Sequence, residues 1–274
     1  MSQPVYLVEL LKKIYPSRFF LAKLTRIPIV GHLVDWIFFK GDSTYFLPHE
    51  DVARKLLIEQ EIEAPLEIAL PSQVVTYFIE QAQHHWLMDS CICRDAEGCQ
   101  EYPIDLGCLF LGEATLEINP KLGHHVSKQE ALEHVKRCQE AGLIPFVGRN
   151  KLDSVWLGVR PGEKLLTICH CCPCCCLWGI LPELAPQIEK KIERMPGVMV
   201  TVNGQCTGCG MCAEDICFVR AIRLEDDRAT INEMCKGCGR CVAICPEEAI
   251  ELTIDWEMAV GDSVERLSSL VDVK

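Results

Sequence analysis

The sequence lacks the glycine fingerprints of nucleotide-binding enzymes. The glycines near Gly107 and Gly112 do not have G-x-G-x-x-G spacing after a strand, and no phosphate-binding loop occurs in the 274 residues. We therefore do not expect flavin or nicotinamide chemistry from this chain.

Basic charge is also scarce. The chain has 27 Lys and Arg against 39 Asp and Glu, which gives a net charge of −12 at pH 7. Because nucleic-acid binding requires a basic surface, nucleic acid is not an expected partner. An acidic chain of this kind is better suited to docking on the basic surface of another protein. Hydrophobic residues make up 49% of the chain, which indicates a folded core.

No hydrophobic run is long enough to cross a bilayer. The nearest candidate, residues 27–39, is interrupted by His32 and Asp35 and is too short. Residues 1–40 nevertheless carry six basic and two acidic side chains, in contrast to the acidic remainder. A basic, aromatic-rich amphipathic segment can pack on its own domain, dock to a partner protein or lie on a membrane surface. The sequence leaves these three alternatives open.

Cysteine, by contrast, is abundant, with 19 residues. No secretory signal is recognisable, and a chain of this length does not need disulfides to compensate for a small core. We therefore expect a protein of the reducing cytoplasm whose cysteines bind metal. Peripheral contact with a membrane through residues 1–40 is one of the three alternatives for that segment.

Eight of the cysteines belong to a pattern that is written twice. Residues 201–212 read T-V-N-G-Q-C-T-G-C-G-M-C and residues 230–241 read T-I-N-E-M-C-K-G-C-G-R-C. Each copy continues to a fourth cysteine and a tail, R-A-I-R-L at 220–224 and E-A-I-E-L at 248–252. One difference is that four residues separate Cys212 from Cys217, and Phe218 stands where the second copy has Pro246.

Three cysteines with C-x2-C-x2-C spacing and a remote fourth are typical ligands of a cubic iron–sulfur cluster. The repeat resembles the bacterial two-[4Fe–4S] ferredoxin domain, over about 55 residues. In that family the fourth cysteine of each copy serves the other cluster. The resemblance therefore implies one cluster on Cys206, Cys209, Cys212 and Cys245, and a second on Cys235, Cys238, Cys241 and Cys217. Zinc and disulfides are the alternatives, although a third cysteine at this spacing has no place in a four-ligand zinc site.

Of the eleven remaining cysteines, all of them upstream, ten fall into two groups and Cys138 stands apart. The two groups are Cys91, Cys93, Cys99 and Cys108, followed by Cys169, Cys171, Cys172, Cys174, Cys175 and Cys176. Free and exposed thiols would oxidise, so a subset is expected to ligate at least one additional iron–sulfur cluster. Redox-active thiols, persulfide chemistry and zinc remain alternatives. Adjacent cysteines on an extended segment point to opposite faces, so Cys174, Cys175 and Cys176 are not all expected to ligate one compact site. The leading ligands are Cys91, Cys93, Cys99, Cys172 and Cys175.

The sequence predicts an α+β protein. Residues 1–70 form a basic, aromatic-rich helical segment, and residues 71–196 a cysteine-rich mixed α/β domain. Residues 197–254 form the ferredoxin-like module, a βαβ-type repeat with two hairpins related by a pseudo-twofold axis. Residues 255–274 form a closing helix. Within the second segment, Ser127 and Glu130 predict a helix start, residues 155–159 a strand, and residues 182–194 a helix.

The whole arrangement is similar to a group of poorly characterised ferredoxin-domain proteins of anaerobic bacteria and archaea, which implies anaerobic redox metabolism. The first functional hypothesis is an electron-transfer protein that works with a redox partner protein. The alternatives are a reductase that acts on a disulfide or sulfur compound at the upstream centre, and a docking subunit of a larger redox complex.

Overall fold

The structure, a computed structural model, describes residues 5–59, 70–214 and 216–274. The remaining positions of the predicted 1–70 segment lie outside the described residues. A seven-stranded sheet organises the larger part of the chain, with strand order β4-β2-β3-β6-β5-β1-β7. Its strands are β1 (Ser43–Phe46), β2 (His85–Met88), β3 (Leu109–Leu111), β4 (Gly123–His125), β5 (Ile144–Arg149), β6 (Leu166–Cys171) and β7 (Ile192–Arg194).

Neighbouring strands of this sheet run antiparallel except for β1 and β7, which are parallel. Strand β1 comes from the segment that the sequence predicted to be helical. It lies between β5 and β7, where Tyr45 pairs with Val147 on one side and with Glu193 on the other. All four residues of β1 are buried, so the N-terminal segment contributes to the core and is not a separate helical unit.

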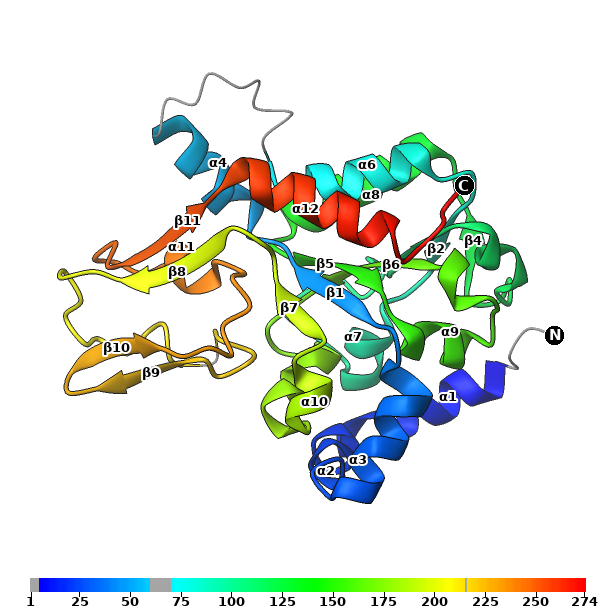
Figure 1. Cartoon of the computed structure of the whole chain (residues 1–274), viewed down its shortest axis with the longest axis horizontal. Helices are drawn as coiled ribbons and strands as arrows, with labels where there is room; N and C mark the ends of the chain where they lie inside the picture. The colour runs from blue at the N-terminus through cyan, green and yellow to red at the C-terminus, as the bar shows by residue number, and fades with distance from the viewer. Residues whose placement is uncertain (1–4, 60–69, 215) are drawn as a thin grey trace.

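Helices cover both faces of the sheet (Figure 1). On one face lie α6 (Gln73–Gln81), α8 (Lys128–Glu140) and α12 (Trp256–Ser268), with α4 (Glu50–Glu59) beside them. On the other lie α7 (Ile92–Glu97), α9 (Lys151–Leu157), α10 (Pro186–Glu189) and the N-terminal helices α1 (Val5–Ile14), α2 (Arg18–Leu24) and α3 (Pro28–Val34). Short helical turns complete the set: η1 (Tyr15–Ser17), η2 (Asp35–Phe39), η3 (Glu113–Glu117), η4 (Gly162–Lys164) and η5 (Leu177–Glu183).

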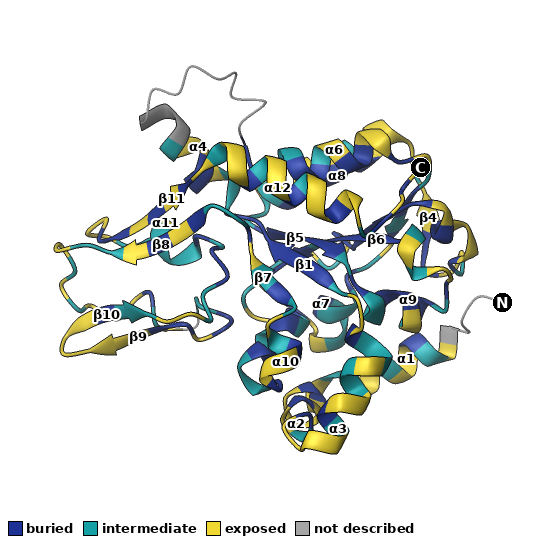
Figure 2. Cartoon of the chain, viewed as in Figure 1, coloured by how far each residue is buried: buried dark blue, intermediate teal, exposed yellow. Residues whose placement is uncertain are grey.

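Alternation along the strands divides the core into two layers. In β5, Val147 faces the core formed with α6 and α8, whereas Phe146 and Ile144 face the opposite core with Trp178. Successive side chains of a strand point to opposite faces, so a sheet with helices on both sides is apolar on both. The central strands β1, β5 and β6 are accordingly dark in the burial view, between exposed outer helix surfaces (Figure 2).

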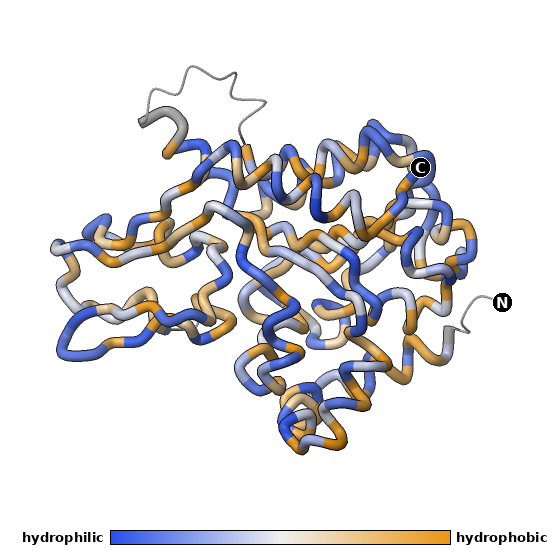
Figure 3. Tube along the Cα trace, viewed as in Figure 1, coloured by the Kyte–Doolittle hydropathy of each residue, from blue (hydrophilic) through white to orange (hydrophobic). Residues whose placement is uncertain are grey.

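The N-terminal helices leave much apolar surface exposed. Helix α1 is amphipathic, as the sequence predicted, with Val8 buried and Leu10 half exposed. Phe20, Ile29 and Trp36 are 65%, 83% and 61% exposed. Hydrophobic and polar positions alternate along this edge of the molecule (Figure 3). None of the helices in the described ranges is both long and apolar enough to span a membrane.

The repeated segment forms two separate antiparallel ribbons beside the large sheet. One pairs β9 (Ile222–Glu225) with β10 (Arg228–Ile231), and the other pairs β8 (Val198–Val202) with β11 (Ile250–Ile254). A short helix, α11 (Arg240–Ile244), precedes β11. Each ribbon therefore combines one strand from each copy of the repeat. That the repeated segment is a ferredoxin-like module stays a prediction.

Two predicted elements are wrong. Residues 155–159 are not a strand, because Val155 lies in α9, which ends at Gly158 in a left-handed conformation. The helix predicted over residues 182–194 is replaced by η5, α10 and strand β7. The helix predicted from Ser127 and Glu130 is confirmed as α8, including the reciprocal hydrogen bonds of the capping box.

Candidate metal and redox centres

The repeat cysteines gather into two quartets, each with three ligands from one copy and one from the other. Cys245 lines the same hollow as Cys206, Cys209 and Cys212. We call this set the outer quartet. The inner quartet consists of Cys217, Cys235, Cys238 and Cys241, whose thiols act electrostatically on one another. The structure thus brings together the two sets that the family resemblance implies, while the identity of the clusters they hold stays a prediction.

The surroundings of the quartets suit thiolate ligands. The amide of Ala221 donates to Sγ of Cys217 at 3.2 Å, and the amide of Ala249 donates to Sγ of Cys245 at 3.3 Å. These two bonds occupy equivalent positions of the two copies. Backbone N–H groups that point at sulfur stabilise negative charge on it. The donor set therefore fits an iron–sulfur group at both quartets.

Glycines are required at the loops for a reason that the sequence did not show. Gly208 has a φ of +72°, and a Cβ there would lie 2.2 Å from the carbonyl oxygen of Asp227. Its equivalent, Gly237, has a φ of +69° and would collide with Arg194 and Val198 side chains. The glycines thus permit left-handed backbone and close packing of each loop against its neighbours.

The two quartets differ in their access to solvent. Cys209 of the outer quartet is exposed, and hydrogen bonds from the amides of Ala229 and Gly208 lower the pKa of Cys206. In the inner quartet, burial raises the pKa of Cys238 to about 11 and also raises that of Cys241. Neutral thiols are favoured at the inner quartet until a metal compensates their charge.

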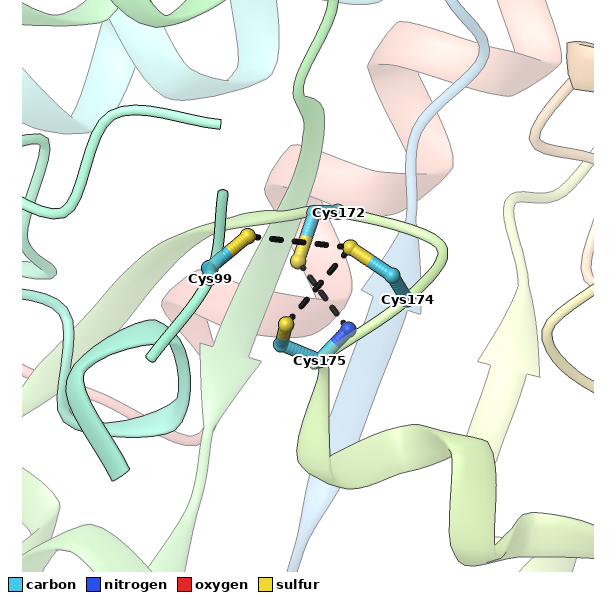
Figure 4. Close-up of side chains that lie close together, drawn as sticks. All are labelled: Cys99, Cys172, Cys174 and Cys175. Carbon is cyan, nitrogen blue, oxygen red and sulfur yellow. Dashed lines mark hydrogen bonds between the residues drawn. The ribbon is translucent and has the colours of Figure 1, made fainter. Parts of the chain in front are cut away.

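Four upstream cysteines converge on one point. They are Cys99, Cys172, Cys174 and Cys175, which we call the four-thiol group, and all four sulfur atoms lie within 4.8 Å of one another (Figure 4). Sγ of Cys174 lies 3.8 Å from Sγ of Cys99 and 3.5 Å from Sγ of Cys175. The amide of Cys175 also donates to Sγ of Cys172 at 3.3 Å.

The remaining six members of the two upstream groups line a cavity of about 490 Å³, which Cys172 of the four-thiol group also lines. They are Cys91, Cys93, Cys108, Cys169, Cys171 and Cys176, and we call them the cavity cysteines. They form three thiol pairs, of which Cys169 and Cys108 are 3.1 Å apart. The other pairs are Cys91 with Cys93 and Cys171 with Cys176. The opposite wall consists of apolar side chains of α1, α2 and α3, including Leu11, Leu21 and Val34.

Ion pairs hold the N-terminal helices over this cavity. Nζ of Lys12 lies 2.7 Å from a carboxylate oxygen of Asp95. Nη1 of Arg18 lies 2.5 Å from Oε1 of Glu97. Both acidic residues belong to α7, whose first turn carries Cys93. The hydroxyl of Tyr15 donates to the carbonyl oxygen of Cys175 at 2.7 Å. The cavity is therefore closed on one side by contacts to the cysteine-bearing segments themselves.

Arg94 lies between the four-thiol group and the cavity. It is only 1% exposed and donates to the carbonyl oxygens of His170, at 2.9 Å, and of Leu106. Burial opposes the charged guanidinium, but the thiols of Cys91 and Cys172 outweigh it and the pKa of Arg94 is raised. In the same way, a hydrogen bond from Cys93 and the charge of Arg94 lower the pKa of Cys91 to about 6. The buried guanidinium thus favours the thiolate form of Cys91.

The sequence analysis did not find one further group of potential metal ligands. His134, Cys138 and His170 are all buried, and their potential ligand atoms lie within 4.8 Å of one another. His134 Nε2 contacts the carbonyl oxygen of Gly107 at 2.9 Å and Sγ of Cys138 at 3.4 Å. Both ring nitrogens of His170 are buried without a hydrogen-bond partner. The H-x3-C spacing on α8 was the signal, but sequence gave no reason to add His170.

The leading upstream ligands chosen from the sequence do not form one site. Cys99, Cys172 and Cys175 belong to the four-thiol group, whereas Cys91 and Cys93 line the cavity. Cys174 was a candidate ligand but not a leading one, and Cys174, Cys175 and Cys176 were not all expected to share a site. A turn at residues 173–175 instead lets Cys174 and Cys175 share a site. All nineteen cysteines are free thiols in the structure.

Comparison with known proteins bears on the repeat. Residues 212–255 match the family described as the LdpA Fe-S cluster-binding domain. The match includes every cysteine of the inner quartet together with Cys212 and Cys245. No curated protein and no solved structure matches the chain. The family match and the grouped cysteines together indicate an iron–sulfur binding domain with a redox role, without fixing the number or type of clusters.

Proposed function

We propose that this chain is an iron–sulfur electron-transfer protein. The outer and inner quartets each hold one [4Fe–4S] cluster, and single electrons pass through them to or from a further centre at the cavity cysteines. Such clusters supply one-electron chemistry at potentials that depend on ligation, hydrogen bonds to sulfur and solvent exposure.

One observation carries this proposal: three cysteines of the inner quartet pack against the same apolar core as two of the cavity cysteines. Cys217, Cys235 and Cys238 contact the apolar core that contains Cys171 and Cys176. At the other end, the thiol of Cys212 in the outer quartet acts electrostatically on Cys241 in the inner quartet. The order from the outer quartet, with its exposed Cys209, through the half-buried inner quartet to the core beside the cavity supports this relay.

The test is oxygen-free purification followed by iron and acid-labile sulfide analysis and electron paramagnetic resonance after reduction. Two clusters correspond to about eight irons per chain, and a further cubic cluster would bring this to about twelve. A colourless sample without labile sulfide would refute the proposal. A sample with about eight irons would support the relay but remove the cluster assigned to the cavity.

The cavity itself favours a second candidate, a reductase for a disulfide or small sulfur compound. Its volume of about 490 Å³ lies in the range of small-molecule sites. Two electrons from the reduced clusters and two protons would convert one disulfide into two thiols. We would mix reduced protein with a small disulfide. The two readouts are the visible absorbance of the clusters, which should return as they are reoxidised, and the amount of thiol released. Cys171→Ser should abolish this reaction, and Met199→Ser, an exposed change on β8, should not.

A further inference from the structure

The four-thiol group differs from both quartets of the repeat in how tightly its sulfur atoms gather. Among the cysteines, histidines and carboxylates in the described parts of the chain, it is the one set of four whose ligand atoms all lie within 4.8 Å of each other. Neither the outer nor the inner quartet meets this limit, although both consist of cysteine alone.

This spacing distinguishes a single ion from a cluster. A zinc ion bound tetrahedrally at about 2.3 Å places its thiolate sulfurs about 3.8 Å apart. In a cubic cluster each thiolate binds a different iron atom, so the ligand sulfurs are spread more widely. The measured separations of 3.8 Å and 3.5 Å from Cys174 to its two neighbours match the first geometry.

We infer that the four-thiol group binds one zinc ion, separate from the iron–sulfur centres. Its ligands are Cys99, Cys172, Cys174 and Cys175. Four thiolates around Zn²⁺ leave a net charge of −2, and the surroundings offset it. The buried guanidinium of Arg94 lies on one side, and the amide of Cys175 donates to Sγ of Cys172. Three of the four ligands are buried, whereas Cys174 is exposed and gives the ion a way in.

The position of the ion gives it a structural task. Cys172 directly follows the cavity cysteine Cys171, and Cys175 directly precedes the cavity cysteine Cys176. Cys99 lies just beyond the C-terminal end of α7, whereas Cys93 lies in its first turn. An ion that joins these points fixes the two cysteine-bearing segments that form the thiol wall of the cavity. Because Zn²⁺ has no redox chemistry, it would hold that wall without exchanging electrons.

The test is metal analysis of untagged protein purified without oxygen. We expect one zinc per chain, with an X-ray absorption spectrum showing four sulfurs at about 2.3 Å. Cys174→Ser should reduce the zinc to below about a tenth of an equivalent after dialysis, because a closed structural site requires all of its thiolates. Iron, labile sulfide and the paramagnetic signals should stay unchanged.

Cys176→Ser is the matched control, because it alters the next cysteine but leaves the four-thiol group intact; zinc should be retained. The inference is overturned if wild-type protein contains no zinc, if the zinc has nitrogen or oxygen ligands, or if Cys174→Ser loses iron and sulfide instead. The spectrum of the wild type decides the question even if the variant does not fold. A sample with zinc but no iron would refute the proposed function and leave the zinc site standing.

Discussion

Arg240 reaches out of the duplicated segment and donates a hydrogen bond to the carbonyl oxygen of Cys171, with 2.6 Å between the nitrogen and oxygen atoms. Arg240 lies between Cys238 and Cys241 of the inner quartet, and Cys171 is the last residue of β6 and a cavity cysteine. This bond therefore connects the two sites between which electrons are proposed to pass.

Removing this hydrogen bond should weaken the junction between the duplicated segment and the cavity, and so lower the stability of the protein. Arg240→Gln loses a charge-assisted bond, which typically contributes about 1.5–3 kcal/mol. We expect the free energy of unfolding to fall by that order in anaerobic denaturation, with the iron content kept. Arg220→Gln, which removes an exposed ion pair with Glu183, is the control and should cost less than about 1 kcal/mol. Equal effects of the two changes would argue against a structural role for the junction.

Exchange of the fourth ligand between copies can be tested at Cys245. Because Cys245 lines the outer quartet, Cys245→Ser should remove about four irons from the three cysteines of the first copy. Cys217→Ser should instead damage the inner quartet. Electron paramagnetic resonance of the two variants should lose different signals. If Cys245→Ser eliminates the cluster at Cys235, the assignment of the quartets is wrong.

Asp42 predicts a pH dependence that is separate from metal binding. Burial raises the pKa of this carboxyl from 3.8 to about 7, although the amide of Lys151 donates to it at 2.8 Å. The folded state therefore holds a proton that the unfolded state has lost between about pH 4 and pH 7. Stability should fall as the pH rises through this window, by about 1.4 kcal/mol for each unit of the shift.

The variant Asp42→Asn should flatten this dependence. Denaturant unfolding of wild type and variant at pH 5.5 and pH 8 measures it, and the variant should gain relative to wild type at the higher pH. Asp105→Asn, at an exposed ion pair with Arg137, is the control. An unchanged slope in Asp42→Asn would show that the buried carboxyl is not responsible.

The exposed apolar residues of α2 and α3 lead to a proposal about binding. We propose that this surface docks on anionic lipid, because Lys23, Arg26 and Lys40 are exposed in the same segment of an otherwise acidic protein. Phe20 and Trp36 project from it. Co-sedimentation should show binding to phosphatidylserine vesicles that decreases with salt, and little binding to neutral vesicles.

Replacing both aromatic residues tests the apolar part of this surface. Phe20→Ser with Trp36→Ser should weaken vesicle binding by tenfold or more, since burial of one such side chain contributes about 1.5–3 kcal/mol. Met199→Ser, equally exposed but on β8, should leave binding unchanged. If wild-type protein binds neither type of vesicle, the lipid proposal is ruled out. The alternatives for this surface are then packing on the chain's own domain or docking to a partner protein.

The sequence was informative where local chemistry decides structure. The spacing of Ser127 and Glu130 predicted the start of α8, because the capping box depends only on residues three apart. The repeated cysteine spacing likewise indicated iron–sulfur binding, which the family match supports. In each of these two signals the residues are close to one another in the sequence, so no knowledge of tertiary contacts was needed.

Contacts between distant segments could not be predicted. Residues 155–159 were predicted to form a strand. The carboxylate of Asp153 instead accepts hydrogen bonds from Asn150, Trp156 and Thr167 and holds the first turn of α9. Strand β7 exists through its pairing with β1, about 150 positions away in the chain. The division of the upstream cysteines between the four-thiol group and the cavity depends in the same way on where β6 and α7 meet.

The pairing of β8 with β11 sets Val198 opposite Ile254, so the iron–sulfur segment begins and ends at a single place. The strand before it, β7, belongs to the large sheet, and the helix after it, α12, packs on α6. A cassette whose two ends coincide can be spliced into a surface connection of a host without pulling its flanks apart.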